Sequence, residues 1–219
     1  IGGTLLPEYE DAFARYLVRY VDAYRAQGIP IGMLTIQNEP AFVPQTYPGM
    51  RLDAETRVRI IGEHLGPLLA TRANAPEILE WDHNWDEPGE PLAVLGDPVA
   101  GPYVGGVAWH CYRANAAAQG EVHRAFPRKD AYMTECSGGD WASARNGELL
   151  LFARGILLDS LRHWARGVIY WNLVLDEHYG PHFGGCGNCK GVFTLDSRTG
   201  EVSRNDYYYA FGHFSRFVL

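Results

Sequence analysis

The sequence predicts an α/β fold built on a parallel β-sheet. Five apolar, strand-like runs alternate with amphipathic helical segments along the 219 residues. Repeated strand–helix units place neighbouring strands parallel to one another and cover the sheet with helices. A complete (β/α)8 TIM barrel typically takes about 250 residues, so five units indicate a partial barrel, about strands 4 to 8 with their helices.

The expected helices are defined by apolar spacing and by residues typical of helix ends. Residues 8–27 place aromatic and aliphatic side chains on one helical face, with Pro7 near the start and Gly28 just past the end. Two further helices are expected over 53–71, which an aspartate opens, and over 148–165. The strands between them are expected over residues 31–37, 77–82, 104–110, 131–135 and 167–172.

The chain is expected to be one incomplete domain. Residues 1–219 contain no internal repeat and no linker rich in glycine and serine, so no domain boundary is visible. The opening Ile1-Gly-Gly-Thr is neither a signal peptide nor an ordinary start, which indicates a chain cut from something longer. A barrel open along two edges exposes strand backbone and apolar surface, so we expect marginal stability or aggregation of these residues alone.

Composition and charge limit the classes of partner. An apolar content of 47% is enough for a sizeable core, and no apolar run reaches the roughly 18–20 residues of a membrane span. The net charge of −7, with no lysine- or arginine-rich run, argues against nucleic acid or an anionic membrane as partner. A neutral substrate fits this balance better, and the oligomeric state is left open.

Two glutamates at the ends of expected strands carry the chemistry. Glu39 closes the strand that begins at residue 31, and Glu135 closes the strand over 131–135. A single strand-end glutamate is usually a solvated loop residue, but Asn38 and Pro40 bracket Glu39 as expected for a sugar-binding acid. On one rim of a parallel barrel, two carboxylates about 5 Å apart suit a retaining glycosidase.

Several motifs occur in order along the chain: Leu34-Thr-Ile-Gln-Asn-Glu-Pro40, Tyr47-Pro48, Leu65-Gly-Pro-Leu-Leu69, Val107-Ala-Trp-His-Cys-Tyr112, Thr134-Glu-Cys136, Tyr170-Trp-Asn-Leu173 and Gly212-His-Phe-Ser-Arg-Phe217. In their order and spacing they resemble glycoside hydrolase family 30 in clan A, in its glucosylceramidase and β-1,6-glucanase-like branch. The resemblance covers essentially the whole chain.

The resemblance implies a retaining enzyme in which Glu39 is the acid/base and Glu135 the nucleophile. By the same carry-over, Asn38 would contact the sugar 2-hydroxyl and Tyr112 would orient Glu135 by a hydrogen bond. Trp171 would form an apolar platform under the sugar, although a lone tryptophan is also often a core residue. The family further implies that the first three barrel strands precede this chain and that its last residues lead towards a β-sandwich.

Other residues are expected at the pocket by the same resemblance or by their place after a strand. His110 and Tyr47 would line the pocket. Trp81 and Asp82 open a segment with two aromatic rings and several hydrogen-bonding groups, which suits a sugar subsite or, equally, an ordinary loop with a buried ring. We expect the phenol of Tyr112 to keep Glu135 charged, whereas an acid/base such as Glu39 needs a raised pKa.

The four cysteines allow several interpretations. Cys186 and Cys189 are candidates for a local disulfide over the rim, which fits an exported enzyme. The same pair could instead be free, or could bind zinc together with His178 and His182. A thioredoxin-like redox site is disfavoured because the pair follows a loop rather than opening a helix.

Two remaining alternatives concern the class of protein. Cys136 acting as a nucleophile with His110 as its base is disfavoured, because the adjacent glutamate explains the motif more simply. A non-catalytic carbohydrate-binding protein would be expected to lack one of the carboxylates, and a zinc-dependent hydrolase would need the cluster of His178 to Cys189 to hold the metal.

The expected function is hydrolysis of a β-glucosidic bond by double displacement. The substrate would be glucosylceramide-like or a β-1,6-glucan, with a xylan-directed member of the same family as the alternative. Two carboxylates and a water suffice for this reaction, so no cofactor and no metal are expected at the site. We expect a secreted or periplasmic protein, of bacterial source.

Overall fold

The computed structural model describes residues 2–141 and 148–217. The expectations about the two ends of the chain rest partly on Ile1 and on residues 218–219, which lie outside the described residues. Within the described part of the chain, no helix has both the length and the apolar composition needed to cross a membrane.

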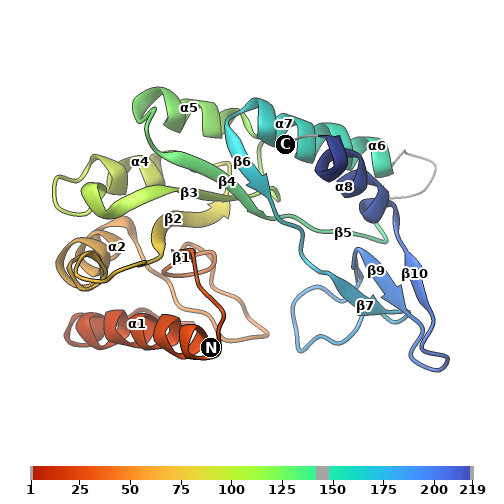
Figure 1. Cartoon of the computed structure of the whole chain (residues 1–219), viewed down its shortest axis with the longest axis horizontal. Coiled ribbons are helices and arrows are strands. Elements are labelled where there is room, and N and C mark those ends of the chain that lie inside the picture. The colour runs from red at the N-terminus through yellow and green to blue at the C-terminus, as the bar shows by residue number, and fades with distance from the viewer. Residues whose placement is uncertain (1, 142–147, 218–219) are drawn as a thin grey trace.

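A five-stranded parallel sheet forms the centre of the molecule, as the sequence predicts (Figure 1). Its strand order is β1–β2–β3–β4–β6, so strands that are consecutive in this part of the chain are neighbours in the sheet. This order and direction are those of a segment of a barrel wall. The strands are β1 (Met33–Thr35), β2 (Glu77–Asn84), β3 (Val104–His110), β4 (Asp130–Glu135) and β6 (Ala165–Val168).

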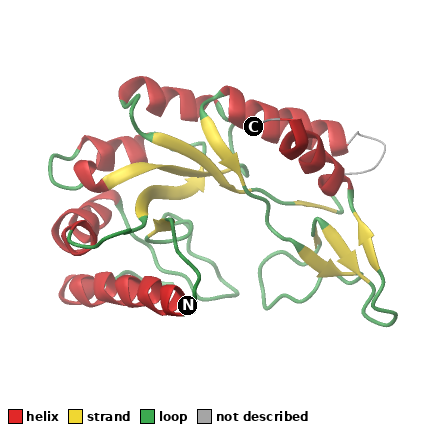
Figure 2. Cartoon of the chain, viewed as in Figure 1, coloured by secondary structure: helices red, strands yellow, loops and turns green. Residues whose placement is uncertain are grey.

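The helices form an arc on the outer side of this sheet (Figures 1 and 2). The helices expected over 53–71 and 148–165 are each continuous but contain a π-helical middle, η2 (Ile60–Leu65) and η5 (Ala153–Leu158). Asp53 caps the first of them by accepting a hydrogen bond from the Thr56 N–H. The α-helices are α1 (Glu10–Ala26), α2 (Ala54–Arg59), α3 (Gly66–Ala70), α4 (Gly89–Gly96), α5 (Ala117–Ala125), α6 (Glu148–Phe152), α7 (Asp159–Arg162) and α8 (Asp206–Phe217), with 3-10 turns η1 (Pro7–Tyr9) and η3 (Gly101–Tyr103).

Two small sheets follow the barrel segment, and the sequence did not indicate them. One contains β7 (Val174–Asp176), β9 (Phe193–Leu195) and β10 (Val202–Arg204). The other pairs β5 (Gly138–Gly139) with β8 (Cys189–Lys190). Strands of two or three residues are too short to show the alternation by which strands are recognised in a sequence.

A buried ion-pair network joins the helical layer to the sheet. The guanidinium of Arg57, on α2, donates to Glu80 Oε1 at 2.6 Å and to the Leu52 carbonyl at 2.8 Å. The side chains of Arg57 and Glu80 are 1% and 0% exposed. Arg57 also donates to Glu90 Oε2 at 2.9 Å and lies over the ring of Trp81. Such a pair is costly to break because each charge is buried.

We predict that Arg57→Met destabilises the protein by about 3–5 kcal/mol, because the Glu80 carboxylate is left buried without a cation. Urea unfolding followed by circular dichroism measures the loss, which can be large enough to unfold the chain at 25 °C. The double variant Arg57→Met/Glu80→Leu removes both charges and is expected to be more stable than Arg57→Met alone.

The exposed pair between Arg15 and Asp11 provides the control. Arg15→Ala is expected to change the free energy of unfolding by no more than about 0.5 kcal/mol, because solvent screens this pair. If Arg57→Met and Arg15→Ala lowered the free energy of unfolding equally, the buried network would stabilise the protein no more than the exposed pair does.

Candidate active site

The expected site residues lie at the carboxyl ends of the parallel strands, which meet at one rim. Glu39 follows β1, Asp82 lies two residues before the end of β2, His110 ends β3 and Glu135 ends β4, while Trp171 follows β6. Parallel strands present their carboxyl ends on the same side of a sheet, and ligands bind there in open and closed α/β sheets alike. The fold therefore gathers residues that are up to 132 positions apart in the sequence.

Backbone strain accompanies this gathering. Glu39, Trp81 and Asp82 have φ values of +47°, +74° and +53°, which are unusual for residues with a side chain. The Glu39 N–H donates to the Asp82 carbonyl at 3.0 Å, so the two strained segments support each other. The pairing of β2 with β3 also shifts between Trp81 and His83. Such irregularities re-aim side chains next to functional sites.

His110 lies between the carboxylates. Its side chain is 1% exposed, its Nδ1 is 3.0 Å from Glu39 Oε1, and its Nε2 is 3.2 Å from Asp82 Oδ1. The same Nε2 is 3.9 Å from Glu135 Oε2. The two glutamates therefore contact opposite sides of one imidazole, which brings both carboxylates into a single cluster.

Asp82 is positioned by hydroxyl groups from the adjacent strand β1 and from β4, two strands away in the sheet. Thr35, on β1, donates to Asp82 Oδ2 at 2.7 Å, and Thr134, on β4, donates to Asp82 Oδ1 at 2.7 Å. Together with His110, these contacts use both carboxylate oxygens of Asp82. This carboxylate is therefore a fixed partner for the histidine rather than a free group.

Glu135 is held from the neighbouring strand end by Tyr112. The Tyr112 hydroxyl donates to Glu135 Oε1 at 2.9 Å, and the Tyr112 N–H donates to Asn84 Oδ1 at 2.9 Å. A disulfide between Cys111 and Cys136 joins the residues that directly follow His110 and Glu135. This disulfide was not predicted from the sequence, and it removes the thiol that a Cys136 nucleophile would need.

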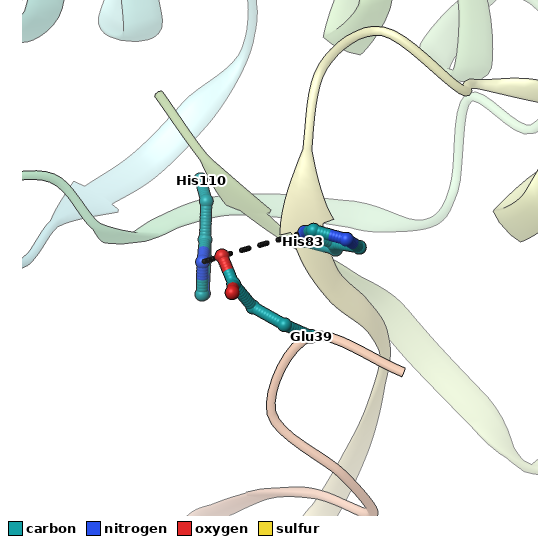
Figure 3. A group of neighbouring side chains, drawn as sticks. All are labelled: Glu39, His83 and His110. Atoms are coloured by element: carbon teal, nitrogen blue, oxygen red, sulfur yellow. Dashed lines mark hydrogen bonds and ion pairs between the residues drawn. The ribbon is translucent and has the colours of Figure 1, made fainter. Parts of the chain in front are cut away.

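A second histidine faces Glu39. His83 Nδ1 is 3.4 Å from Glu39 Oε1, but it makes no hydrogen bond within the described residues. Figure 3 shows the carboxylate of Glu39 between the rings of His83 and His110, which come from adjacent strands. His83 was not among the predicted site residues, although it lies inside the segment that begins at Trp81.

The electrostatics of the cluster favour an ionised Glu39 beside a protonated His110. Burial alone would raise the pKa of Glu39, but the hydrogen bond with His110 and the charges of His110 and His83 lower it to about 2. Burial likewise opposes the charge on His110, and its hydrogen bonds to Asp82 and Glu39 outweigh this and raise its pKa to about 9. One proton is therefore held between Glu39 and His110, on the imidazole.

The pKa of Glu135 is shifted in the opposite direction to that of Glu39. Burial raises the pKa of Glu135, and the charge of His110 and the Tyr112 hydroxyl oppose this only in part. Burial and the charge of Glu135 raise the pKa of Tyr112, so it donates as a neutral phenol. The order of the two glutamate pKa values is the reverse of the expected one, because both histidines lie closer to Glu39 than to Glu135.

A cleft of about 620 Å³ opens above the two glutamates. Its walls include the expected residues Asn38, Tyr47 and Trp171. Its rim carries two exposed aromatic rings, Trp141 and Phe183, that the sequence analysis did not select. Aromatic faces beside a few polar groups are typical of a site for a sugar.

Loops far apart in the sequence form the walls of this cleft. The Cys186–Cys189 disulfide lines it, and β8 pairs with β5 just after Glu135. Across the cleft, the Gly185 N–H donates to Thr46 Oγ1 at 3.3 Å. Because the two cysteines are bonded to each other, they offer no thiolate to the zinc cluster considered with His178 and His182.

Trp81 does not lie where the sequence predicted. Its ring is buried in the core, beneath the Arg57 guanidinium, and its Nε1 donates to the Asn84 carbonyl at 2.9 Å. The irregularity of β2 at this position turns the ring towards the helical layer, so it does not line the cleft. Asp82 and His110 are not in the wall of this cleft either; they line a neighbouring cavity together with Glu135, where His110 contacts Asp82 and both glutamates.

Some of the site residues that were not predicted carry a signal in the sequence, and others carry none. Cys111 and Cys136 occupy equivalent positions just after two neighbouring strands, which is a usable signal for a disulfide. Thr35 and Thr134 lie within apolar strands and show no such signal. Trp141 and Phe183 belong to long connections whose path the sequence does not define.

Comparison with known proteins agrees with the motifs. The model of the glycosyl hydrolase family 30 TIM-barrel domain matches residues 1–218. An endo-1,6-β-D-glucanase of Aspergillus fumigatus is 37% identical over 99% of this chain and 43% of that protein. Lysosomal acid glucosylceramidase of Mus musculus is 27% identical over 96% of this chain and 43% of its own length.

A solved endo-β1,6-glucanase has the same architecture, with a TM-score of 0.91 and 31% identity over 98% of this chain and 50% of that one. The chain thus spans about half the length of the relatives that it matches. The resemblance that the sequence motifs indicated is confirmed, and the parallel sheet is part of a barrel. The chain belongs to the glycosyl hydrolase family 30 TIM-barrel domain family.

Proposed function

We propose that this chain carries the catalytic half of a retaining β-glycosidase that cleaves β-1,6-glucosidic bonds in a glucan. The observation that carries the proposal is the meeting of two strand-end glutamates at opposite sides of His110, beneath one aromatic-lined cleft. A non-catalytic carbohydrate-binding protein has no need for two partly buried, supported carboxylates. We further propose that the five parallel strands are strands 4 to 8 of the complete barrel.

Glu135 is the proposed nucleophile. Its oxygen attacks the anomeric carbon while Glu39 gives a proton to the departing oxygen, which leaves a covalent glycosyl–Glu135 ester. Glu39 then takes a proton from water, whose oxygen displaces Glu135 from the sugar. Tyr112 supports the attack because its hydroxyl fixes Glu135 Oε1 and stabilises the charged form.

The proton that Glu39 needs is held in the resting site by His110. Asp82, fixed by Thr35 and Thr134, accepts from His110 Nε2 and so keeps that nitrogen protonated. The mobile proton is then the one on Nδ1, which faces Glu39 Oε1 at 3.0 Å. A sugar that fills the cleft excludes water and disfavours the ion pair, which moves this proton onto Glu39.

The substrate assignment follows the relatives. Three endo-1,6-β-D-glucanases are 35–37% identical to this chain, whereas the glucosylceramidase of Mus musculus is 27% identical. An open cleft with rings at its rim suits a chain of sugars. A glucosylceramide-like substrate is the second candidate, and no described residue favours xylan.

We also propose that the protein is exported to an oxidising compartment. The two disulfides, Cys111–Cys136 and Cys186–Cys189, support this proposal, because disulfides persist in secreted and periplasmic proteins and are rare in the cytosol. Both bonds lie at the rim of the site.

The test uses protein that contains this chain and the rest of its barrel. A β-glucose-configured epoxide inactivator is expected to label Glu135, as read by peptide mass. Glu135→Gln should give no adduct and should lose activity on β-1,6-glucan by about 10⁴-fold or more, as when other covalent nucleophiles are removed. Glu39→Gln should lose activity on glucan but still release an activated phenol in a single burst, because such a leaving group needs no acid.

Glu121→Gln is the matched control, because this glutamate is exposed on α5 in the helical layer. It should label and hydrolyse like the parent protein. An adduct on Glu39 instead of Glu135 would reverse the proposed roles, and hydrolysis by Glu135→Gln at the parent rate would refute them.

We predict that Tyr112→Phe lowers kcat/KM by about 10–150-fold, the value of a hydrogen bond to a charged group. Without the Tyr112 hydroxyl the pKa of Glu135 rises, so the acid limb of the kcat/KM profile should move to higher pH. Tyr103→Phe, in η3 away from the cleft, is the control. A Tyr112→Phe profile that moves to lower pH would contradict this assignment.

We predict that stability is highest between about pH 4.5 and 6.5. The pKa of Glu39 is lowered to about 2, so its contribution is present above about 4.5 and is lost as pH falls towards 2. The pKa of His110 is raised to about 9, so its contribution is present below about 6.5 and is lost as pH rises towards 9. Urea unfolding at a series of pH values measures this profile.

His110→Gln should remove most of the alkaline loss, which is on the order of 3 kcal/mol. The groups that face His110 are Asp82, Glu39 and Glu135, and the shared Glu39–His110 contact means that the two contributions do not add. His123→Gln, at a ring stacked on Trp164, is the control. An unchanged alkaline slope in His110→Gln would contradict the prediction.

A further inference from the structure

We propose that Glu39, His83 and His110 form a site for a single Zn²⁺ ion, which inhibits the protein by occupying Glu39. The ligand atoms that the three side chains offer all lie within 4.8 Å of one another, and the Nδ1 atoms of both histidines face Glu39 Oε1. Figure 3 shows these side chains converging from two adjacent strands and from the segment after β1. Two imidazoles and one carboxylate are a donor set that Zn²⁺ prefers.

The spacing of the donors fits the ion. Zinc bonds to nitrogen and oxygen are about 2.0–2.2 Å long, so tetrahedral ligands lie roughly 3.3 Å apart. Glu39 Oε1 lies 3.0 Å from His110 Nδ1 and 3.4 Å from His83 Nδ1. Only the two nitrogens need to approach each other, and rotation of the His83 ring, whose Nδ1 makes no hydrogen bond within the described residues, provides this movement.

An outer carboxylate already orients one of the ligands. His110 turns Nδ1 towards Glu39 because its Nε2 is bonded to Asp82 Oδ1 at 3.2 Å. Histidines that bind metals usually donate their other ring N–H to a carboxylate, which fixes the tautomer and raises the basicity of the ligand. Thr35 and Thr134 in turn hold Asp82, so this support is rigid.

His83 provides an independent observation. The residue is 9% exposed, yet its Nδ1 has no hydrogen-bond partner within the described residues. A buried polar atom without a partner is unfavourable. Its nearest charged neighbour is Glu39 Oε1, so a cation placed between them would satisfy both atoms.

A second opening gives the ion access and a free position. A cavity of about 440 Å³ is lined by Glu39 and His83, and also by the acidic side chains of Asp86, Glu87 and Glu90. These carboxylates attract a cation, although Arg51, Arg113 and the Arg57 that pairs with Glu90 offset part of their charge. Three protein ligands beside an opening leave the fourth position of the zinc for water.

The ion would take the place of the proton between Glu39 and His110, and this proton passes to solvent. The inhibition follows from the proposed acid/base role of Glu39, whereas the binding itself does not depend on that role. Calorimetry therefore tests the zinc site alone. Zinc that binds without inhibiting would contradict the proposed role of Glu39 and leave the zinc site intact.

The test is calorimetric titration of ZnCl₂ into purified protein that contains the chain, in metal-free buffer. We expect one ion per chain with a dissociation constant in the micromolar range, and no binding of MgCl₂. His83→Gln should weaken binding by about 100-fold or more, and Asp82→Asn, which alters only the outer partner, by about 10–100-fold. Near-ultraviolet circular dichroism establishes that each variant is folded.

His178→Gln is the control, because this exposed histidine belongs to the loop near Cys186 and should not affect binding. Co²⁺ used in place of Zn²⁺ should give the visible bands of a site with nitrogen and oxygen ligands and no sulfur-to-metal band, even if His83→Gln fails to fold. Zn²⁺ affinity that is unchanged in His83→Gln, affinity lost in His178→Gln, a sulfur-to-metal band, or no binding at millimolar Zn²⁺ would each overturn the proposal.

Discussion

The arrangement of the site depends on one buried imidazole held between carboxylates. His110 ends β3, and its two ring nitrogens face Glu39, which follows β1, and Asp82, which lies near the end of β2. A nearly inaccessible histidine in this position is stable only if both nitrogens have partners, since an unpaired buried polar group is costly. The ring therefore fixes the positions of the ends of β1, β2 and β3 relative to one another. Glu135, at the end of β4, lies 3.9 Å from its Nε2.

Covalent and backbone links hold the connections that a sheet alone would leave loose. The Cys111–Cys136 disulfide joins the two residues that follow His110 and Glu135, and the pairing of β5 with β8 ties the segment after Glu135 to the Cys186–Cys189 loop. Loops are usually the most mobile part of a fold. Here the loops that line the cleft are bound to the strands whose carboxylates they surround, so cleft shape and carboxylate position are coupled.

The sequence was informative where a side chain follows directly from a regular strand. Glu39 and Glu135 could be placed on one rim because parallel strands share a direction. Trp81 was misplaced because it was assigned to a segment after the strand, whereas β2 continues to Asn84 and is irregular beside Trp81. His83 was missed for the same reason, and the short strands β7 to β10 were missed because they lack a pattern. Long-range contacts of this kind depend on packing, which no local pattern contains.

The reversed order of the glutamate pKa values has one geometric origin. Burial acts on Glu39 and Glu135 in the same direction, so it cannot separate them. The separation comes from the histidines, both of which present Nδ1 to Glu39 Oε1. An acid/base poised in this way does not store its proton itself; it shares the proton with a neighbour that a fixed carboxylate keeps in one tautomer. The histidine nitrogens that converge on Glu39 make such sharing possible, and they also make the position attractive to a cation. A proton and a metal ion would therefore compete for the same atoms.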